Sequence, residues 1–408
     1  MLTSLALIFL VGISLAAIFK KIKLPGIIGM LITGVVLGPY ALDLLDSSIL
    51  GISSELRQMA LVIILLKAGL SLDLKDLKKV GRPAILMSFL PAVFEIAAFL
   101  IFAPAVLGVN RAEAALMGAV LAAVSPAVVV PRMVQMMEQK YGTGKGIPQM
   151  ILAGASLDDV FVIVLFTAFL GMAQGKGANA VSLLNIPVSI VLGVVLGAAA
   201  GFLLSWLFET NYSHKHLVRN SMKVIIILGT AFLLLAVEKW LDGTVAVSGL
   251  LAVMSMGMVI AARSVPEVTQ RLREKYGKLW LAAEVVLFVL VGAAVDISKT
   301  FEAGAGAVLM IFTALLFRCV GVTLCLIGTK LNVKERLYCV IADIPKATVQ
   351  AAIGAVPLSL GLPCGNVILS VAVLSIVITA PLGAIGMDLS YKKLLRKEPE
   401  TSTDCDKA

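Results

Sequence analysis

The chain has 408 residues, of which 60% are hydrophobic and only 14% are charged, and its formal net charge is +9. Soluble globular domains are about half apolar and about a quarter charged, so this composition excludes an ordinary soluble domain. The apolar residues gather in segments of about 20 residues, the length of helix that crosses about 30 Å of hydrocarbon. The sequence therefore predicts an all-α polytopic membrane protein.

Thirteen segments in chain order have the length and hydropathy of transmembrane helices. They lie near residues 2–19, 24–40, 54–71, 81–107, 111–137, 147–172, 184–207, 217–237, 244–262, 279–296, 304–328, 335–358 and 365–387. The connections between them are too short to hold a soluble domain. We expect a transmembrane domain over residues 1–390 and a polar cytoplasmic tail over residues 391–408.

Basic residues are distributed unevenly over the connections between these spans. Most of the 34 Lys and Arg residues lie in alternate connections, and the other set of connections holds only Arg57, Arg111, Lys176, Lys239 and Lys299. Cytoplasmic loops carry the excess of basic residues in membrane proteins. We therefore expect a multi-pass protein of the plasma membrane with its N-terminus outside and its C-terminus in the cytoplasm. This topology explains the positive charge without a nucleic-acid partner.

Two spans end on the same pattern, Gly-x-x-x-Asp. It occurs as Gly69–Asp73 at the end of the third span and as Gly292–Asp296 at the end of the tenth. The two spans are an odd number apart, so they cross the membrane in opposite directions. Many transporters consist of two halves of opposite topology, with the binding site at the midplane between them. The pattern predicts that spans 1–6 are repeated as spans 8–13, with span 7 as a linker.

The fifth and twelfth spans, which correspond to each other in this repeat, are both interrupted by proline. The fifth contains Pro126 and Pro131, and the twelfth contains Pro345, Gly354 and Pro357. Proline inside a helix removes a hydrogen bond and clashes with the preceding turn. Broken helices at matching positions of two repeats indicate a binding site, although two unrelated kinked helices would give the same pattern.

Two adjacent carboxylates, Asp158 and Asp159, lie near the middle of the sixth span in the stretch AGASLDDVFVIVLF. Neighbours on a helix point about 100° apart, so the two side chains are expected to face different surroundings and to differ in role. Burial and a neighbouring like charge both favour the protonated carboxyl, and the ionised form is a hard ligand suited to Na⁺ or Li⁺. Such a pair can bind either a proton or a metal cation. A purely structural pair, capping or bridging helices, is the alternative.

Glu95 and Arg318 occupy corresponding positions in the fourth and eleventh spans. Arginine keeps its charge, so a guanidinium in the membrane needs a counter-ion. A pair of Arg318 with Glu95 would be structural and would leave both aspartates free. A pair of Arg318 with Asp159 would instead take part in the transport cycle.

Lys346 follows the break in the twelfth span, and Ser125 precedes the break in the fifth. Lys346 could oppose the helix-end dipoles that meet there or bind an acidic residue, and Asp343, one turn earlier, is its expected local partner. Ser125 could offer a hydroxyl or carbonyl oxygen to a cation. We therefore include both residues in the predicted site.

At these residues the chain resembles the monovalent cation:proton antiporters of the two-aspartate type. The shared features are the aspartate pair, the stretch VSPAVVVP upstream of it, and a later span that carries Phe288, Gly292 and Asp296. The resemblance covers residues 24–385. It is greatest to the sodium/hydrogen exchanger-like subgroup that includes animal members and has an arginine at the position of Arg318.

The resemblance implies that Asp159 is the main carboxylate that binds the cation and the proton, with Asp158 beside it. Many two-aspartate relatives have a lysine at the position of Arg318, and a lysine can give up its proton when buried, whereas arginine does not. One-for-one exchange is therefore at least as plausible as exchange of two protons. The resemblance also implies a homodimer with elevator-like alternating access. Its core would comprise residues 54–172 and 279–387, and its dimerisation part residues 2–40 and 184–262.

We therefore expect a secondary antiporter that exchanges protons for Na⁺ or Li⁺, or for K⁺, and so serves pH homeostasis. An organic-anion/sodium symporter on the same scaffold would not need adjacent acids at the midplane, and a cation channel would need a continuous ring of pore-lining groups. An enzyme is not expected, because the spans contain no histidine and the chain has no HExxH or Gly-x-Ser-x-Gly motif. No cofactor is expected; a metal ion at Asp158 and Asp159 would be the transported one.

Overall fold

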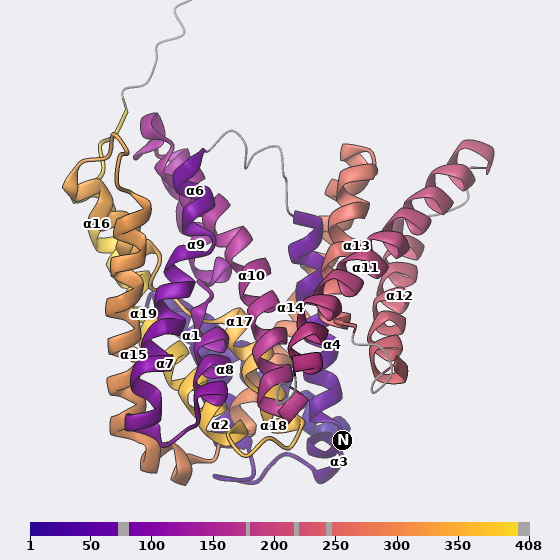
Figure 1. Ribbon diagram of the computed structural model, residues 1–408, viewed down its shortest axis with the longest axis horizontal. Coiled ribbons are helices and arrows are strands. Elements are labelled where there is room, and N and C mark those ends of the chain that lie inside the picture. The colour runs from indigo at the N-terminus through magenta and orange to yellow at the C-terminus, as the bar shows by residue number, and fades with distance from the viewer. Residues whose placement is uncertain (72–80, 177–179, 216–219, 242–246, 399–408) are drawn as a thin grey trace, which may run out of the picture.

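The structure is a computed structural model that describes residues 1–71, 81–176, 180–215, 220–241 and 247–398. Its long helices stand beside one another in a bundle, as Figure 1 shows. Within these ranges, the only β-type pairing is one isolated bridge between Tyr141 and Lys397. Asp73, one end of the predicted repeat pattern, and the tail beyond Glu398 lie outside the described residues.

Every expected span contains one or more helices. In the first half these are α1 (Leu2–Lys21), α2 (Gly26–Leu37), α3 (Ser47–Gly51), α4 (Ser53–Ser71), α6 (Arg82–Met87), α7 (Leu90–Leu107), α8 (Arg111–Ala122), α9 (Pro126–Glu138) and α10 (Ile147–Gly171). In the second half they are α11 (Ala180–Lys215), α12 (Asn220–Leu241), α13 (Gly249–Arg263), α14 (Pro266–Ala293), α15 (Ile297–Cys325), α16 (Val333–Ala342), α17 (Thr348–Gly354), α18 (Val356–Ser359) and α19 (Gly365–Leu394). Short 3₁₀ and π turns, Thr143–Lys145 and Met172–Lys176, flank α10.

Nine helical segments within the described ranges are long and apolar enough to cross a membrane, and Gly26–Leu37, Gly249–Arg263 and Thr348–Ser359 are shorter apolar helices. The chain is therefore a helical multi-pass membrane protein. The helix α4 falls outside both sets because Glu55, Arg57 and Lys67 lower its hydropathy. The count of thirteen spans remains a prediction.

Several helix boundaries differ from the expected ones, and two of these differences change how the helices are divided or packed. The fourth span is divided at Ser88 and Phe89 into α6 and α7, and α14 begins at Pro266 rather than near residue 279. The added turns of α14 are amphipathic and bury Leu272 and Tyr276, whose hydroxyl donates to the Val224 carbonyl at 3.0 Å. Hydropathy missed this segment because only one of its faces is apolar.

The helices α2, α4, α13 and α14 pack on one another. A Cβ on Gly34 of α2 would overlap the carbonyl oxygen of Val289, and one on Gly292 of α14 would overlap that of Leu31. On the other side, Gly69 of α4 allows the same close approach to α13. The two glycines of the repeat pattern thus lie where helix backbones touch, which only a residue without a side chain permits.

A second set of contacts joins α7 to α8 and α15, α10 to α8 and α9, and α19 to α15 and α16. Figure 1 shows α7, α15 and α16 on the left and α11, α12 and α13 together on the right. The helices α4 and α14 pack with each other, α4 also packs with α13, and α14 also packs with α2. By these contacts a packing boundary lies after α4 and after α14, and the expected division at residues 54 and 279 stays a prediction.

Candidate functional site

The two interrupted spans break at their centres and touch at the breaks. The helix α8 ends at Ala122, and α9 begins at Pro126 with Ser125 as its extended N-cap residue. The helix α16 ends at Ala342, and α17 begins at Thr348. The backbone N–H of Ser125 donates to the carbonyl of Pro345 at 2.8 Å. The two non-helical backbone segments at the breaks are thus hydrogen-bonded to each other in the interior of the protein.

Of the four prolines predicted to interrupt the two spans, Pro126 and Pro345 lie at the central breaks, whereas Pro131 lies inside α9 and Pro357 lies in the first turn of α18. Pro126 occupies the first turn of α9, where its missing N–H is not needed, and Pro345 lies within the gap between α16 and α17. Pro131 lies inside the continuous helix α9. The expectation that Pro131 interrupts the span is therefore wrong, because a proline inside a helix can be accommodated by bending without ending the helix.

Three carbonyl groups at the end of α8, freed by the break, accept hydrogen bonds from side chains of the other half. Nε2 of Gln350 donates to Leu121 at 3.2 Å and to Ala123 at 2.7 Å. Arg318 Nη1 donates to the Ala122 carbonyl, and Lys346 Nζ lies 3.4 Å from the same oxygen. Two cations thus sit at the negative end of the α8 dipole.

The freed N–H groups at the breaks have partners as well. Val124 donates to Oδ2 of Asp158 at 2.8 Å. Lys346 donates its backbone N–H to the Thr379 hydroxyl at 2.9 Å, and Ala347 donates to Oε1 of Gln350 at 2.8 Å. Irregular backbone at membrane depth is tolerated where such partners exist.

Arg318, on α15, is 1% exposed and faces three carboxylates. Its Nη1 lies 2.9 Å from Glu95 Oε2, and its Nη2 lies 3.2 Å from Asp158 Oδ2. Its Nε donates to the backbone carbonyl of Asp343 at 2.8 Å and lies 2.9 Å from Oδ2 of that residue, an ion-pair distance without hydrogen-bond geometry. Of the two pairings that the sequence left open, the structure contains the one with Glu95, together with a contact to Asp158 rather than to Asp159.

Lys346 is buried and pairs with Glu95 rather than with its sequence neighbour. Its Nζ lies 2.7 Å from Glu95 Oε2, the oxygen that Arg318 also binds. The expectation that Asp343 is the local partner of Lys346 is therefore wrong: the gap after α16 is not helical, so the one-turn spacing does not bring the two side chains together.

The aspartate pair lies at the middle of α10, and its two members have different surroundings. Asp158 is fully buried, and Asp159 is 8% exposed. Oδ2 of Asp158 is held by Val124 and Arg318, whereas the Oδ1 atoms of Asp158 and Asp159 are buried and have no hydrogen-bond partner within the part of the chain that the structure describes. A buried carboxylate oxygen without a donor is costly unless a cation or a proton occupies it.

Ser125 is fully buried at the crossing, and its Oγ lies 3.5 Å from the hydroxyl of Thr348. It stands next to Val124, whose N–H holds Asp158, so a hydroxyl and a carboxylate share this end of the break. Among the residues of the described ranges, no group of three or more His, Cys, Asp or Glu side chains has the arrangement of a metal site.

Sequence reasoning missed Gln350, Thr379 and the contact of Asp343 with Arg318. Gln350 had a usable signal, since it is a single amide in the otherwise apolar run that follows the break. Thr379 had none, because a single hydroxyl in an apolar span is usually explained without a partner in another helix, and the one-turn spacing of Asp343 favours its sequence neighbour Lys346 as partner.

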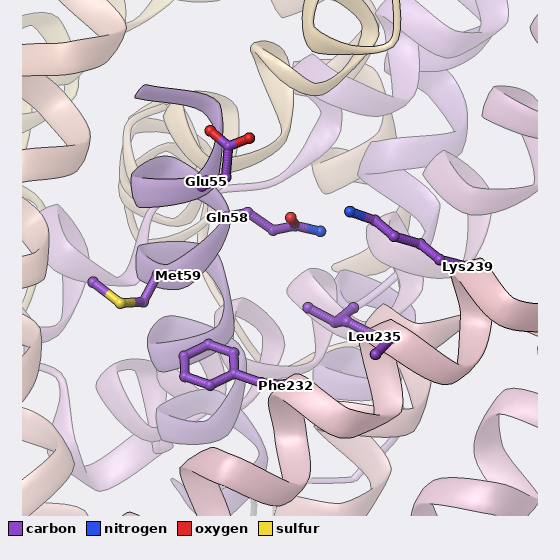
Figure 2. A pocket seen from close by; sticks show the side chains of 7 residues that line it. Glu55, Gln58, Met59, Phe232, Leu235 and Lys239 are labelled. Atoms are coloured by element: carbon purple, nitrogen blue, oxygen red, sulfur yellow. The ribbon is translucent and has the colours of Figure 1, made fainter. Parts of the chain in front are cut away.

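A recess of about 260 Å³ lies apart from these residues. Figure 2 shows it between α4 and α12, with Glu55, Gln58 and Lys239 at its polar side and Met59, Phe232 and Leu235 at its apolar side. None of the residues at the two breaks lines it.

Comparison with known proteins places this geometry in a family. The family model described as sodium/hydrogen exchanger, transmembrane, matches residues 5–388. The sodium/hydrogen exchanger 9B2 of Mus musculus is 31% identical over 414 residues, covering 97% of this chain and 74% of that protein. The human protein of the same name is 33% identical over 361 residues, covering 86% of this chain and 66% of that protein. The chain thus spans about two thirds to three quarters of the length of these relatives.

The fold also matches a solved structure. The sodium proton antiporter MjNhaP1 from Methanocaldococcus jannaschii at pH 8 superposes with a TM-score of 0.79 and 23% identity, covering 96% of this chain and 98% of that one. At this identity the likeness shows the fold alone. Taken with the family match over residues 5–388, it leads to one conclusion: the chain belongs to the sodium/hydrogen exchanger family, a family of membrane transporters and not of enzymes.

Proposed function

We propose that this protein exchanges protons for Na⁺ or Li⁺ across the membrane, with K⁺ as a third candidate cation, and that Asp158 and Asp159 bind the cation and the proton in competition. The observation that carries the proposal is the pair of buried Oδ1 atoms at the centre of α10, neither of which has a hydrogen-bond donor within the described residues. A proton or a hard monovalent cation satisfies such an oxygen, and the two occupants exclude each other by charge. The family membership and the sodium/hydrogen exchange after which its relatives are named support the same proposal.

The two aspartates have different tasks in this proposal. Asp158 is held by the N–H of Val124 and by Arg318, so it positions the site and contributes one oxygen. Asp159 has no such tie to Arg318 and carries the exchange. Ser125, at the end of the break beside Asp158, supplies a further oxygen to the cation.

Glu95, Arg318 and Lys346 act as a fixed ion cluster that joins the two halves. Arg318 contacts the ends of both α8 and α16, the two half-helices that stop at the breaks. Arginine does not release its proton at physiological pH. Arg318 therefore stays charged while the aspartates change occupants.

An inverted repeat agrees with the helix contacts. If spans 1–6 correspond to spans 8–13, the contact of α4 with α13 should have a counterpart in α14 with α2, and both pairs pack closely. The contacts of α10 with α16 and of α19 with α8 correspond in the same way. We propose that the site lies on the pseudo-symmetry axis between the halves, as in other transporters of this design.

Transport by an elevator-type movement would divide the chain along the packing boundary. In this proposal α7 to α10 and α15 to α19 carry the site through the membrane, while α1, α2, α4 and α11 to α14 form the static, dimerising part of a homodimer. The N-terminus faces outside and the C-terminus the cytoplasm of the plasma membrane, in agreement with the distribution of Lys and Arg. Exchange of this kind would serve pH homeostasis.

The test uses purified protein reconstituted into lipid vesicles with an acidic interior. Addition of Na⁺, Li⁺ or K⁺ outside should release protons through the wild-type protein, and Asp159→Asn should abolish this flux. Asp43→Asn is the matched control, because Asp43 lies in an exposed loop at a left-handed φ of 49°, a conformation that asparagine also adopts. Full cation-driven flux in Asp159→Asn would refute the assignment.

A further inference from the structure

Asp343 is a third buried carboxylate close to the aspartate pair. It is 4% exposed, and its Oδ2 lies 2.9 Å from Nε of Arg318. The same Nε donates to the backbone carbonyl of Asp343 at 2.8 Å, so side chain and backbone together hold one edge of the guanidinium. Glu95 and Asp158 contact the opposite edge through Nη1 and Nη2.

Two features of the position of Asp343 are unfavourable for a carboxylate. It is the C-cap residue of α16, where the helix dipole is negative and repels an acidic side chain. It is also buried in the interior of the membrane domain, where an ionised group without a partner is expensive. Arg318 is the one cation at ion-pair distance from it within the described residues. The contact with Arg318 is therefore the feature that offsets both costs.

A charge balance shows what this contact changes at the site. The cluster holds two cations, Arg318 and Lys346, and both bind the same oxygen of Glu95. One glutamate neutralises one of the two charges. The second positive charge has two carboxylates within reach, Asp158 and Asp343. Without Asp343, Asp158 would be the required counter-ion of Arg318 and a poorer ligand for a transported cation.

We propose that Asp343 is a positioning residue that supplies the counter-charge of Arg318 and fixes its guanidinium between the two breaks, so that Asp158 keeps an oxygen for the transported cation. This inference rests on the proposed function. Asp343 itself does not touch the cation in this arrangement. It acts through Arg318, by reducing the positive potential that the aspartate pair experiences.

The experiment measures exchange rates of Asp343→Asn in reconstituted vesicles as a function of Na⁺ concentration. Asparagine has the shape of aspartate and leaves the backbone carbonyl that Nε binds, so it removes the charge alone. The apparent KM for Na⁺ is expected to rise about fivefold to tenfold, where tenfold corresponds to about 1.4 kcal/mol of binding. The maximal rate should change much less. Asp388→Asn, which removes the partner of Arg132 at the exposed end of α19, is the matched control and should leave the KM unchanged.

A second variant separates a charge effect from damage to the fold. Asp343→Asn combined with Lys346→Gln restores the balance, because Glu95 then serves Arg318 alone. The KM of this double variant should return to within about twofold of the wild-type value, whereas two structural defects would add. If Asp343→Asn alone yields no monodisperse protein, the double variant is still expected to fold and exchange.

The outcomes distinguish this inference from the proposed function. A wild-type protein without cation-driven proton flux would refute the exchange activity itself. Exchange in the wild type with an unchanged KM in Asp343→Asn, or a double variant that is worse than the single one or does not fold, would overturn the role of Asp343 and leave the exchange activity standing.

Discussion

Gln350→Leu is the substitution that most directly tests whether side chains of one half support the broken helix of the other. Gln350 is fully buried and makes three hydrogen bonds to backbone groups: with Leu121 at 3.2 Å, with Ala123 at 2.7 Å and with Ala347 at 2.8 Å. Leucine has a similar volume and no polar atom, so all three backbone groups lose their partner.

The expected cost follows from measured hydrogen-bond strengths in membrane proteins, which average about 0.6 kcal/mol and reach about 1.7 kcal/mol. Three such bonds give a loss of about 2–5 kcal/mol in the free energy of unfolding. This should lower the melting temperature of the detergent-purified protein by at least about 3 °C. It should also lower the exchange rate, because Leu121 and Ala123 lie on either side of the Ala122 carbonyl that Arg318 binds.

The assay is a thermal melt monitored by size-exclusion chromatography, with Gln350→Leu and Gln58→Leu measured in parallel. Gln58 lies on α4 at the recess of Figure 2, which no residue of the breaks lines, so the same replacement there should shift the melting temperature by less than about 1 °C. Gln350→Leu melting at the wild-type temperature would refute the view that these three bonds hold the break together.

Two further experiments test the helix contacts and the ion cluster. Gly292→Ala should lower the free energy of unfolding by about 1–3 kcal/mol, because the added Cβ would meet the backbone of α2. The control is Gly277→Ala on the same helix, whose Cβ meets nothing within 4 Å, so its effect should be neutral or slightly stabilising. Equal melting temperatures of the two variants would contradict the close approach of α14 to α2. Glu95→Gln and Arg318→Gln, made singly and together, should show a coupling of about 1–3 kcal/mol in unfolding free energy, and strictly additive effects would exclude a direct pair.

The helices of the fold could be predicted from hydropathy because each long apolar stretch has to form its own backbone hydrogen bonds in lipid. Hydropathy and the presence of proline gave wrong helix boundaries at two places. The first turns of α14 are amphipathic and were missed, and Pro131 lies in α9 without ending it. Local sequence gives the presence of a proline but not whether the surrounding helices accommodate a bend.

The site could be predicted in part for the same kind of reason. Asp158, Asp159 and Arg318 are conspicuous in sequence because a charge at membrane depth is costly. Their pairing could not be predicted from the sequence, because the contacts of Arg318 with Asp158 and Asp343 depend on how the two breaks cross. The different surroundings of the two aspartates likewise come from three-dimensional packing, with Val124 facing only the first of them.

Competition between Na⁺ and H⁺ at Asp159 is the central claim, and the vesicle assay measures it directly in the wild-type protein. As the pH falls, the apparent KM for Na⁺ should rise, toward about tenfold per pH unit if one proton is displaced, while the maximal rate at saturating Na⁺ stays nearly constant. Asp159→Asn should show no cation-driven flux at any pH. A KM for Na⁺ that does not depend on pH, or full exchange by Asp159→Asn, would contradict the account.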